Sequence, residues 1–146
     1  MPTSRQFAVK FRDWLLNEFP EVRQVYEGSK TVELAFVGLG AAIPSGDIFG
    51  EFSKLGYTFE YMQEHGAAGG INYNYFDKAG QQIGKGLPTL SVDELRAMSQ
   101  DPAKTVVLVG GGPHKEQSVE IVLTTRMANA IITDEDTARH LLKRSA

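Results

Sequence analysis

The sequence predicts an α/β domain in which a mostly parallel sheet is flanked by helices, with an antiparallel hairpin near residues 71–83. Residues 104–146 alternate strand, helix, strand and helix, and such a βαβα unit has parallel strands joined by right-handed crossovers. Residues 71–76 alternate apolar and polar side chains before a turn at residues 77–80, as the first arm of a hairpin does. The length of 146 residues fits one domain, which we expect to span residues 1–146.

The composition excludes several classes of protein. A formal charge of -3 and a pI near 5.6 provide no general basic surface for DNA or an anionic membrane. The absence of cysteine rules out disulfides and cysteine-ligated zinc. No signal peptide is recognisable, and the apolar runs are shorter than the roughly 18 residues of a membrane helix. We therefore expect a soluble cytoplasmic protein.

The first third of the chain predicts a helix and then a strand. Apolar residues recur at steps of three and four between residues 5 and 19, which indicates an amphipathic helix that ends before Pro20. Residues 21–30 are polar and are predicted to be a connection. Residues 31–37 form a strand that stops at the glycine turn of residues 38–40.

The middle of the chain predicts a short helix and the hairpin. Residues 58–64 form the helix, with Thr58 as its cap. The glycine-rich residues 66–70 are expected to be a flexible link. Residues 71–76 are predicted to be one half-exposed strand that pairs with residues 81–83.

The last third supplies the parallel part of the sheet. Ser91 caps a helix through Met98, because Glu94 follows at the spacing of a capping box. A run of branched side chains from Val106 to Val109 predicts a strand covered on both faces. A helix over residues 113–125, a buried strand over residues 128–132 and a last helix follow. We expect that helix to be capped by Thr133 together with Asp136 three residues later.

The glycines at residues 110–112 form the most distinctive motif. They end a strand just before Pro113, whose fixed φ suits a first helical turn, so their bare amides could hold an anion at the helix terminus. Lys115 would stand beside that terminus as a mobile positive charge. The alternative is that these glycines only permit a tight turn and that Lys115 is an ordinary surface lysine.

The glycines Gly38 and Gly40 end another strand and could line the same edge of the sheet, where open α/β folds bind ligands. They do not match a dinucleotide fingerprint, because no third glycine opens a helix after them. The histidines His65, His114 and His140 lack ligand spacing, so we predict no metal and no cofactor.

The aromatic residues Tyr73, Tyr75 and Phe76 have two possible roles. Placed on a strand, they could stack against a sugar or a base. They could equally pack in the core and across neighbouring strands.

Six segments follow one another in a characteristic order and spacing, and they are Val37–Gly40, Gly66–Gly69, Tyr75–Gly80, Leu90–Leu95, Val107–Lys115 and Ile131–Ala138. In this order and spacing they resemble the C-terminal sugar-binding domain of SorC/DeoR-type bacterial transcriptional regulators.

The resemblance implies a fold like that of phosphosugar isomerases and a role in sensing a sugar or sugar phosphate, without catalysis. It implies that Gly38, Gly40, Gly69, the glycines Gly110, Gly111 and Gly112, and Lys115 border the effector pocket. DNA would be contacted only through a separate N-terminal domain, which this sequence lacks, and the chain would be the later part of the sugar-binding domain. A homo-oligomer is expected, and the family's usual acidic residue is replaced by Gly70.

Two other functions stay open. The first is a sugar-phosphate isomerase, because a fold does not fix a function, and its base would come from Asp47, Glu51 or Asp77. The second is a fragment that binds no ligand and serves in subunit association, because part of a sheet leaves an exposed edge.

Overall fold

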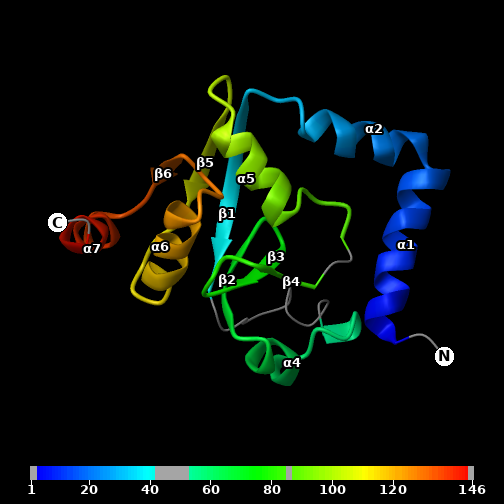
Figure 1. Ribbon diagram of the computed structural model, residues 1–146, viewed down its shortest axis with the longest axis horizontal. Helices are drawn as coiled ribbons and strands as arrows, with labels where there is room; N and C mark the ends of the chain where they lie inside the picture. The colour runs from blue at the N-terminus through cyan, green and yellow to red at the C-terminus, as the bar shows by residue number, and fades with distance from the viewer. Residues whose placement is uncertain (1–2, 42–52, 85–86, 145–146) are drawn as a thin grey trace.

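The computed structural model describes residues 3–41, 53–84 and 87–144, and its centre is a six-stranded mixed sheet (Figure 1). The strand order is β4-β3-β2-β1-β5-β6. The parallel half contains β1 (Leu34–Gly40), β5 (Thr105–Val109) and β6 (Ala130–Ile132). The antiparallel half contains β2 (Ala67–Ile71), β3 (Asn74–Asp77) and β4 (Gln82–Ile83). The α/β class and the hairpin are thus confirmed, with β1 joining the two halves.

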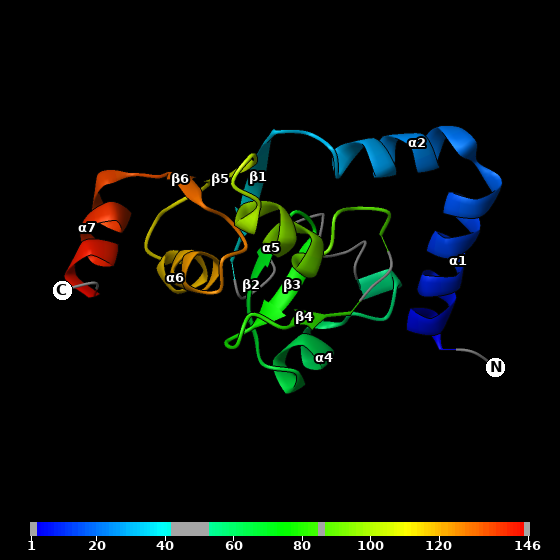
Figure 2. The ribbon, with the colours of Figure 1, turned by 45° about the horizontal axis from the view of Figure 1, so that its top comes forward.

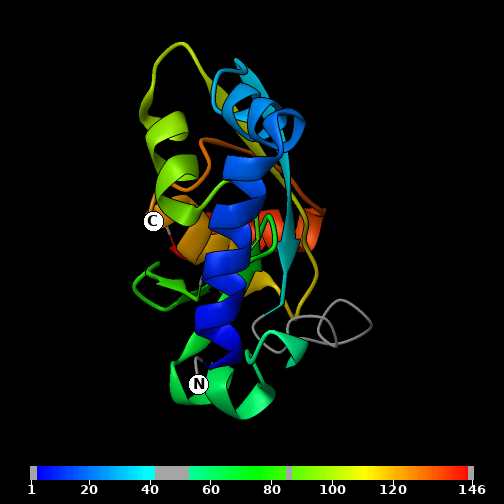
Figure 3. The same cartoon turned by 90° about the vertical axis from the view of Figure 1, so that its right-hand side faces the viewer.

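The core lies between the sheet and two helices, α5 (Val92–Gln100) and α6 (Glu116–Thr124), which lie on the same side of it (Figure 3). The predicted capping box starts α5, because the Ser91 amide donates to the Glu94 carboxylate at 2.8 Å and the Glu94 amide donates to the Ser91 hydroxyl. The residues buried there are mainly branched and aromatic side chains, among them Phe76, Val92, Leu95, Val106, Leu108, Val119 and Val122.

The opposite face of β1, β5 and β6 is open among the described residues. Val109 and Ile132 are exposed, so the prediction that both strands are wholly buried is wrong at these positions. The reason is that the crossover helices cover one face only, and β6 is an edge strand. Val106, Val107 and Leu108 are buried as predicted.

An arm of two helices stands at the side of the sheet (Figures 1 and 2). The predicted first helix is α1 (Ser4–Glu18), and it ends before Pro20 as expected. The predicted connection at residues 21–30 is wrong, because α2 (Pro20–Ser29) occupies it. The ring of Pro20 fixes its φ angle near the helical value at the first position of α2. The buried Tyr26 then anchors this polar helix to the rest of the domain.

The hairpin begins earlier in the chain than the alternation predicted. Helix α4 (Phe59–Glu64) is capped by Thr58, as expected. The prediction that residues 66–70 form a flexible link is wrong, because most of them belong to β2. The turn falls inside the predicted strand, at Asn72 and Tyr73, whose φ values of 49° and 62° are left-handed. Ile71 pairs with Asn74 across this two-residue turn, as in type I′ hairpins.

Two helix starts also differ from the prediction. Helix α6 begins at Glu116, because residues 112–115 close a turn in which the Lys115 amide donates to the Gly112 carbonyl at 2.9 Å. Helix α7 (Glu135–Arg144) is capped by Asp134, whose carboxylate accepts from the Thr137 amide at 2.9 Å. The predicted cap by Thr133 is therefore wrong, since the next residue offers a charged acceptor at the right distance along the chain.

Candidate functional site

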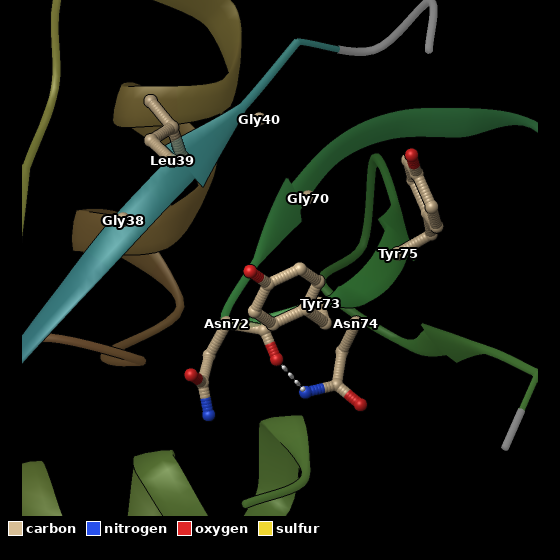
Figure 4. Close-up of a pocket in the computed structure, with 8 residues that line it drawn as sticks. All are labelled: Gly38, Leu39, Gly40, Gly70, Asn72, Tyr73, Asn74 and Tyr75. Carbon is tan, nitrogen blue, oxygen red and sulfur yellow. Dashed lines mark hydrogen bonds between the residues drawn. The ribbon is translucent and has the colours of Figure 1, made fainter. Parts of the chain in front are cut away.

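A pocket of about 350 Å³ opens where β1 ends beside the β2–β3 hairpin (Figure 4). Most of its lining comes from two short stretches that are distant in sequence. The lining residues are Gly38, Leu39, Gly40, Gly70, Asn72, Tyr73, Asn74 and Tyr75.

One wall of the pocket is made of backbone. Gly38 and Gly40 are two residues apart on the strand, so both lie on the exposed face of β1 and leave the backbone bare there. A Cβ atom added at Gly38 would meet nothing within 4 Å, and one at Gly40 would first meet the Gly70 carbonyl oxygen at 3.6 Å. These glycines are therefore not required by packing at these points, and they leave a ligand-sized space over the strand.

The other wall carries two phenol rings. The Tyr73 ring is 55% exposed and stands at the tip of the hairpin, held there by the left-handed turn (Figure 4). Tyr75 lies farther along β3, and burial raises the pKa of its hydroxyl. Phe76, the third aromatic of this stretch, is fully buried and belongs to the core. The two predicted roles for the aromatics thus separate along the strand: core packing for Phe76, and a place in the pocket for the tyrosines.

Two asparagines complete the hydrogen-bonding groups of the pocket. The Asn74 amide is committed to the fold, because its Nδ2 donates to the Leu90 carbonyl at 2.7 Å and its Oδ1 accepts from Gln82. Asn72 is held more loosely, since its Nδ2 donates to the same carbonyl at 3.4 Å. Its side-chain oxygen accepts no hydrogen bond from the described part of the chain, so it can receive a hydroxyl group.

The chemistry of the lining is neutral. Apart from the two tyrosine hydroxyls, the described residues of the lining include no ionisable side chain. Aromatic faces combined with neutral donors and acceptors suit a polyhydroxyl compound better than an ion.

The second glycine turn follows β5, the parallel neighbour of β1, and so lies at the same edge of the sheet. The expectation of bare amides is wrong for Gly110 and Gly112. The Gly110 amide donates to the Ile132 carbonyl at 3.1 Å, and the Gly112 amide donates to the Thr137 hydroxyl at 3.0 Å. These two amides stabilise the neighbouring strand and helix.

The Asp134 carboxylate occupies the space beside Gly111. A Cβ atom at Gly111 would lie 2.0 Å from its Oδ2 atom. Hydrogen bonds from the amide and then the hydroxyl of Thr137 lower the pKa of Asp134, so this carboxylate is charged at neutral pH. Lys115 is half-buried nearby in sequence, and its ammonium makes no hydrogen bond or ion pair with any described residue.

The structure therefore brings together only part of the predicted site. Gly38 and Gly40 line the pocket, whereas Gly69, the turn at residues 110–112 and Lys115 are not in its lining. Gly69 is enclosed by Phe76 and Ser118. Asn72 also lines the pocket, which a single straight strand over residues 71–76 does not predict, because the turn at Asn72 and Tyr73 interrupts that strand.

Of the candidate catalytic carboxylates, Asp77 is not among the described lining residues of this pocket. Asp77 accepts hydrogen bonds from the Ala79 and Gln81 amides at 2.9 and 2.8 Å, so it stabilises the hairpin turn. Asp47 and Glu51 lie outside the described residues. Across residues 3–41, 53–84 and 87–144, no group of three or more potential metal ligands occurs, and no helix has the length and apolarity to cross a membrane.

Comparison with known families gives a match over nearly the whole chain. The family model described as "Putative sugar-binding domain" matches residues 8–143. The transcriptional regulator LsrR of Klebsiella pneumoniae is 30% identical over 138 residues, which cover 88% of this chain and 40% of that protein. The chain thus spans well under half the length of this relative.

Solved structures show the same fold. The sugar-binding domain of the transcriptional regulator DeoR from Pseudomonas syringae pv. tomato is 27% identical, with a TM-score of 0.59, and the match covers 85% of this chain and 45% of that one. The full-length sorbitol operon regulator SorC from Klebsiella pneumoniae is 17% identical, with a TM-score of 0.69, over 90% of this chain and 42% of that one.

Proposed function

Because this chain belongs to the sugar-binding domain family of transcriptional regulators, we propose that it senses a sugar or sugar phosphate in the pocket at the end of β1. The ligand would act as an effector and not as a substrate. Its binding would shift a regulator between states of different DNA affinity, with DNA contacted through a separate domain.

The neutral character of the described lining residues is the observation that carries this proposal. A pyranose or furanose ring could lie over the bare backbone at Gly38 and Gly40, with one face against Tyr73. The side-chain oxygen of Asn72, to which no described residue donates a hydrogen bond, could accept from a sugar hydroxyl, because the left-handed turn places this residue at the pocket.

A phosphate group on the ligand would extend toward the neighbouring glycine turn. Lys115 supports this part of the proposal, because its ammonium is unpaired among the described residues. The turn at residues 110–112 would then serve mainly as a boundary, since two of its amides already have acceptors. Gly69 would support the pocket from behind through its packing.

The same pocket gives little support to isomerase activity. Proton abstraction from a sugar carbon requires a base within hydrogen-bonding reach, and none of the lining residues that the structure describes carries a carboxylate or an imidazole. We therefore propose a binding domain that acts in the cytoplasm as part of a homo-oligomeric regulator.

Calorimetric titration with a panel of sugars and sugar phosphates tests the proposal, and Gly38→Val supplies the diagnostic variant. A Cβ at this position has free space, and valine suits a strand, so the fold should be kept or slightly stabilised. The valine methyl groups would occupy the ligand space, so binding should be lost. Gly28→Ala is the matched control, because an added Cβ also meets nothing there but the residue lies in α2, outside the lining.

Two further variants separate the parts of the ligand. Lys115→Ala should weaken binding of a phosphorylated sugar and leave its unphosphorylated form unaffected. Gly70→Glu introduces the acidic residue that the family resemblance leads one to expect, at a position where a Cβ has only ordinary contacts, 3.4 Å from the Tyr75 ring. It should increase affinity for a sugar hydroxyl group. If no compound of the panel binds, or if Gly38→Val binds as well as the unmodified chain, the pocket is not the effector site.

A further inference from the structure

The tip of the β2–β3 hairpin holds a tyrosine in a strained backbone conformation. Asn72 and Tyr73 form the two-residue turn, with φ values of 49° and 62°. Asparagine tolerates this left-handed region, whereas the Cβ atom of a tyrosine is crowded by its own backbone there. Glycine fits the second position of such a turn best. The side chain of Tyr73 therefore lowers the stability of the turn that carries it.

Contacts within the domain do not offset this strain. The Tyr73 side chain is 55% exposed, and it makes no hydrogen bond and no ring contact with the part of the chain that the structure describes. Among residues 3–41, 53–84 and 87–144, the other non-glycine residue with such a backbone is Arg126, at φ 57°. Arg126 follows α6 and is not a lining residue, whereas the Tyr73 ring lines the pocket (Figure 4). The place of the ring, and not strain alone, therefore points to the ligand.

Three hydrogen bonds fix the turn. The Asn72 amide donates to the Gly38 carbonyl at 3.3 Å, which ties the turn to the opposite wall of the pocket. The Asn72 carbonyl accepts from the Asn74 side chain at 3.0 Å, and the Asn72 side chain donates to the Leu90 carbonyl at 3.4 Å. A strained backbone persists where its surroundings determine it in this way. The backbone that carries the Tyr73 ring is thus fixed before any ligand arrives.

We propose that Tyr73 determines which ligands the pocket accepts. Its ring selects a cyclic sugar over the open-chain alditol that has the same number of carbon atoms. The side chain decreases the stability of the fold and increases the affinity for the cyclic ligand. This inference rests on the function proposed above, because it assigns the specificity of the same pocket.

The shape of a closed sugar ring explains the selection. One side of such a ring presents several C–H bonds together, and their slightly positive hydrogen atoms suit the negative face of a phenol ring. An alditol is a flexible chain without such a face, and ordering it on binding costs conformational entropy. Gly38 and Gly40 leave the backbone bare in the other wall, so a flat ligand has room beside the Tyr73 ring.

Thermal unfolding without ligand tests the strain. Tyr73→Gly produces the asparagine–glycine sequence that such turns favour, so it should raise the melting temperature by about 2–4 °C. Arg126→Gly is the matched control, because it relieves the same kind of strain outside the pocket and should raise the melting temperature by a similar amount. A melting temperature of Tyr73→Gly that is unchanged or lower would show that the ring stabilises the fold, and it would overturn the proposal.

Calorimetric titration tests the selection. Each cyclic sugar is paired with its alditol, such as D-glucose with sorbitol and D-ribose with ribitol, each also as its phosphate. The unmodified chain should bind the cyclic member more tightly. Tyr73→Gly should weaken binding of the cyclic member by about 2- to 10-fold, the effect of one aromatic contact, and should change that of the alditol by less than about 2-fold. Tyr73→Phe keeps the aromatic face and Arg126→Gly leaves the pocket unchanged, so both should bind like the unmodified chain.

The outcomes separate this proposal from the function on which it rests. If the unmodified chain binds a cyclic sugar and Tyr73→Gly binds it equally well, the pocket is a sugar site whose specificity does not come from Tyr73. An equal loss of affinity for both members of a pair, or a loss in Tyr73→Phe, also overturns the proposal, because the aromatic face is then not the selecting group. If the unmodified chain binds no compound of either kind, the proposed function fails and this proposal fails with it.

Discussion

Replacing Gly69 with alanine places a methyl group where the core has no space for it. Gly69 lies in β2, between the Phe76 ring and α6. An added Cβ would lie 2.6 Å from the Phe76 Cζ atom and 2.6 Å from the Ser118 Oγ atom. Both distances are more than half an ångström below an ordinary contact, and both neighbours are fully buried, so the sheet and α6 must separate.

Two terms set the size of the effect. Overpacking of a well-packed core costs about 1–3 kcal/mol. Separation also stretches the 2.8 Å hydrogen bond from the Ser118 hydroxyl to the Ala68 carbonyl, which contributes about 1 kcal/mol. We expect Gly69→Ala to lower the free energy of unfolding by about 2–4 kcal/mol. For a chain of this size, each kcal/mol lowers the melting temperature by about 3 °C, so the melting temperature should drop by about 6–12 °C.

Urea denaturation and differential scanning calorimetry measure this loss, with Gly40→Ala as the control. A Cβ at Gly40 meets its nearest atom at 3.6 Å, so the control should unfold within about 0.5 kcal/mol of the unmodified chain. The packing explanation is refuted if Gly69→Ala is as stable as this control. In that case a loss of ligand binding by Gly69→Ala would identify Gly69 as a binding residue, as the sequence prediction had it.

Two further predictions concern side chains that tie elements together. Burial raises the pKa of Glu94, but hydrogen bonds from Ser91, Tyr26 and Lys30 outweigh it and lower the pKa below its ordinary value of 4.5. The charged carboxylate therefore stabilises the fold above about pH 4.5, and this contribution is lost as the pH falls through the folded pKa. Glu94→Gln should thus be less stable than the unmodified chain at pH 7. In urea titrations, its free energy of unfolding should also decline less steeply as the pH falls below 4.5. A decline as steep as that of the unmodified chain would contradict this. Arg96→Met removes hydrogen bonds to two main-chain carbonyls, each 2.9 Å from the guanidinium. It should lower the free energy of unfolding by about 2 kcal/mol in the same assay. An unchanged free energy of unfolding would show that this arginine does not tie the elements together.

Local signals in the sequence were sufficient for much of the fold. The capping box at Ser91 and the branched run at Val106 each specify their element within a few residues, and both are confirmed. Helix α2 could not be predicted in this way, because its polar residues have no strong period and its stability comes from Tyr26. The Tyr26 hydroxyl donates to Glu94 at 2.7 Å, a residue 68 positions along the chain. Such long-range contacts leave no mark in a local pattern.

The pocket was predictable only in its glycines. Gly38 and Gly40 were identified because a strand that ends in glycine leaves space at a sheet edge. The wall formed by Tyr73 depends on two non-glycine residues in left-handed conformation, which an alternating pattern does not reveal. The Gly110 and Gly112 amides were expected to be free, but β6 and α7 provide acceptors for them. Which amides remain free is decided by tertiary neighbours and not by the turn itself.

The alternation of β1 has a consequence for regulation. Leu34 and Phe36 share one face of this strand with Gly38 and Gly40, so the apolar surface and the floor of the pocket are consecutive positions on a single ribbon. A group that packs against Leu34 and Phe36 therefore lies next to the pocket space above Gly38 and Gly40, because Phe36 and Gly38 are only two residues apart. Thermodynamic linkage requires that an effector which strengthens packing against Leu34 and Phe36 by some factor is itself bound more tightly by the same factor once that surface is covered. The reverse holds for an effector that weakens this packing.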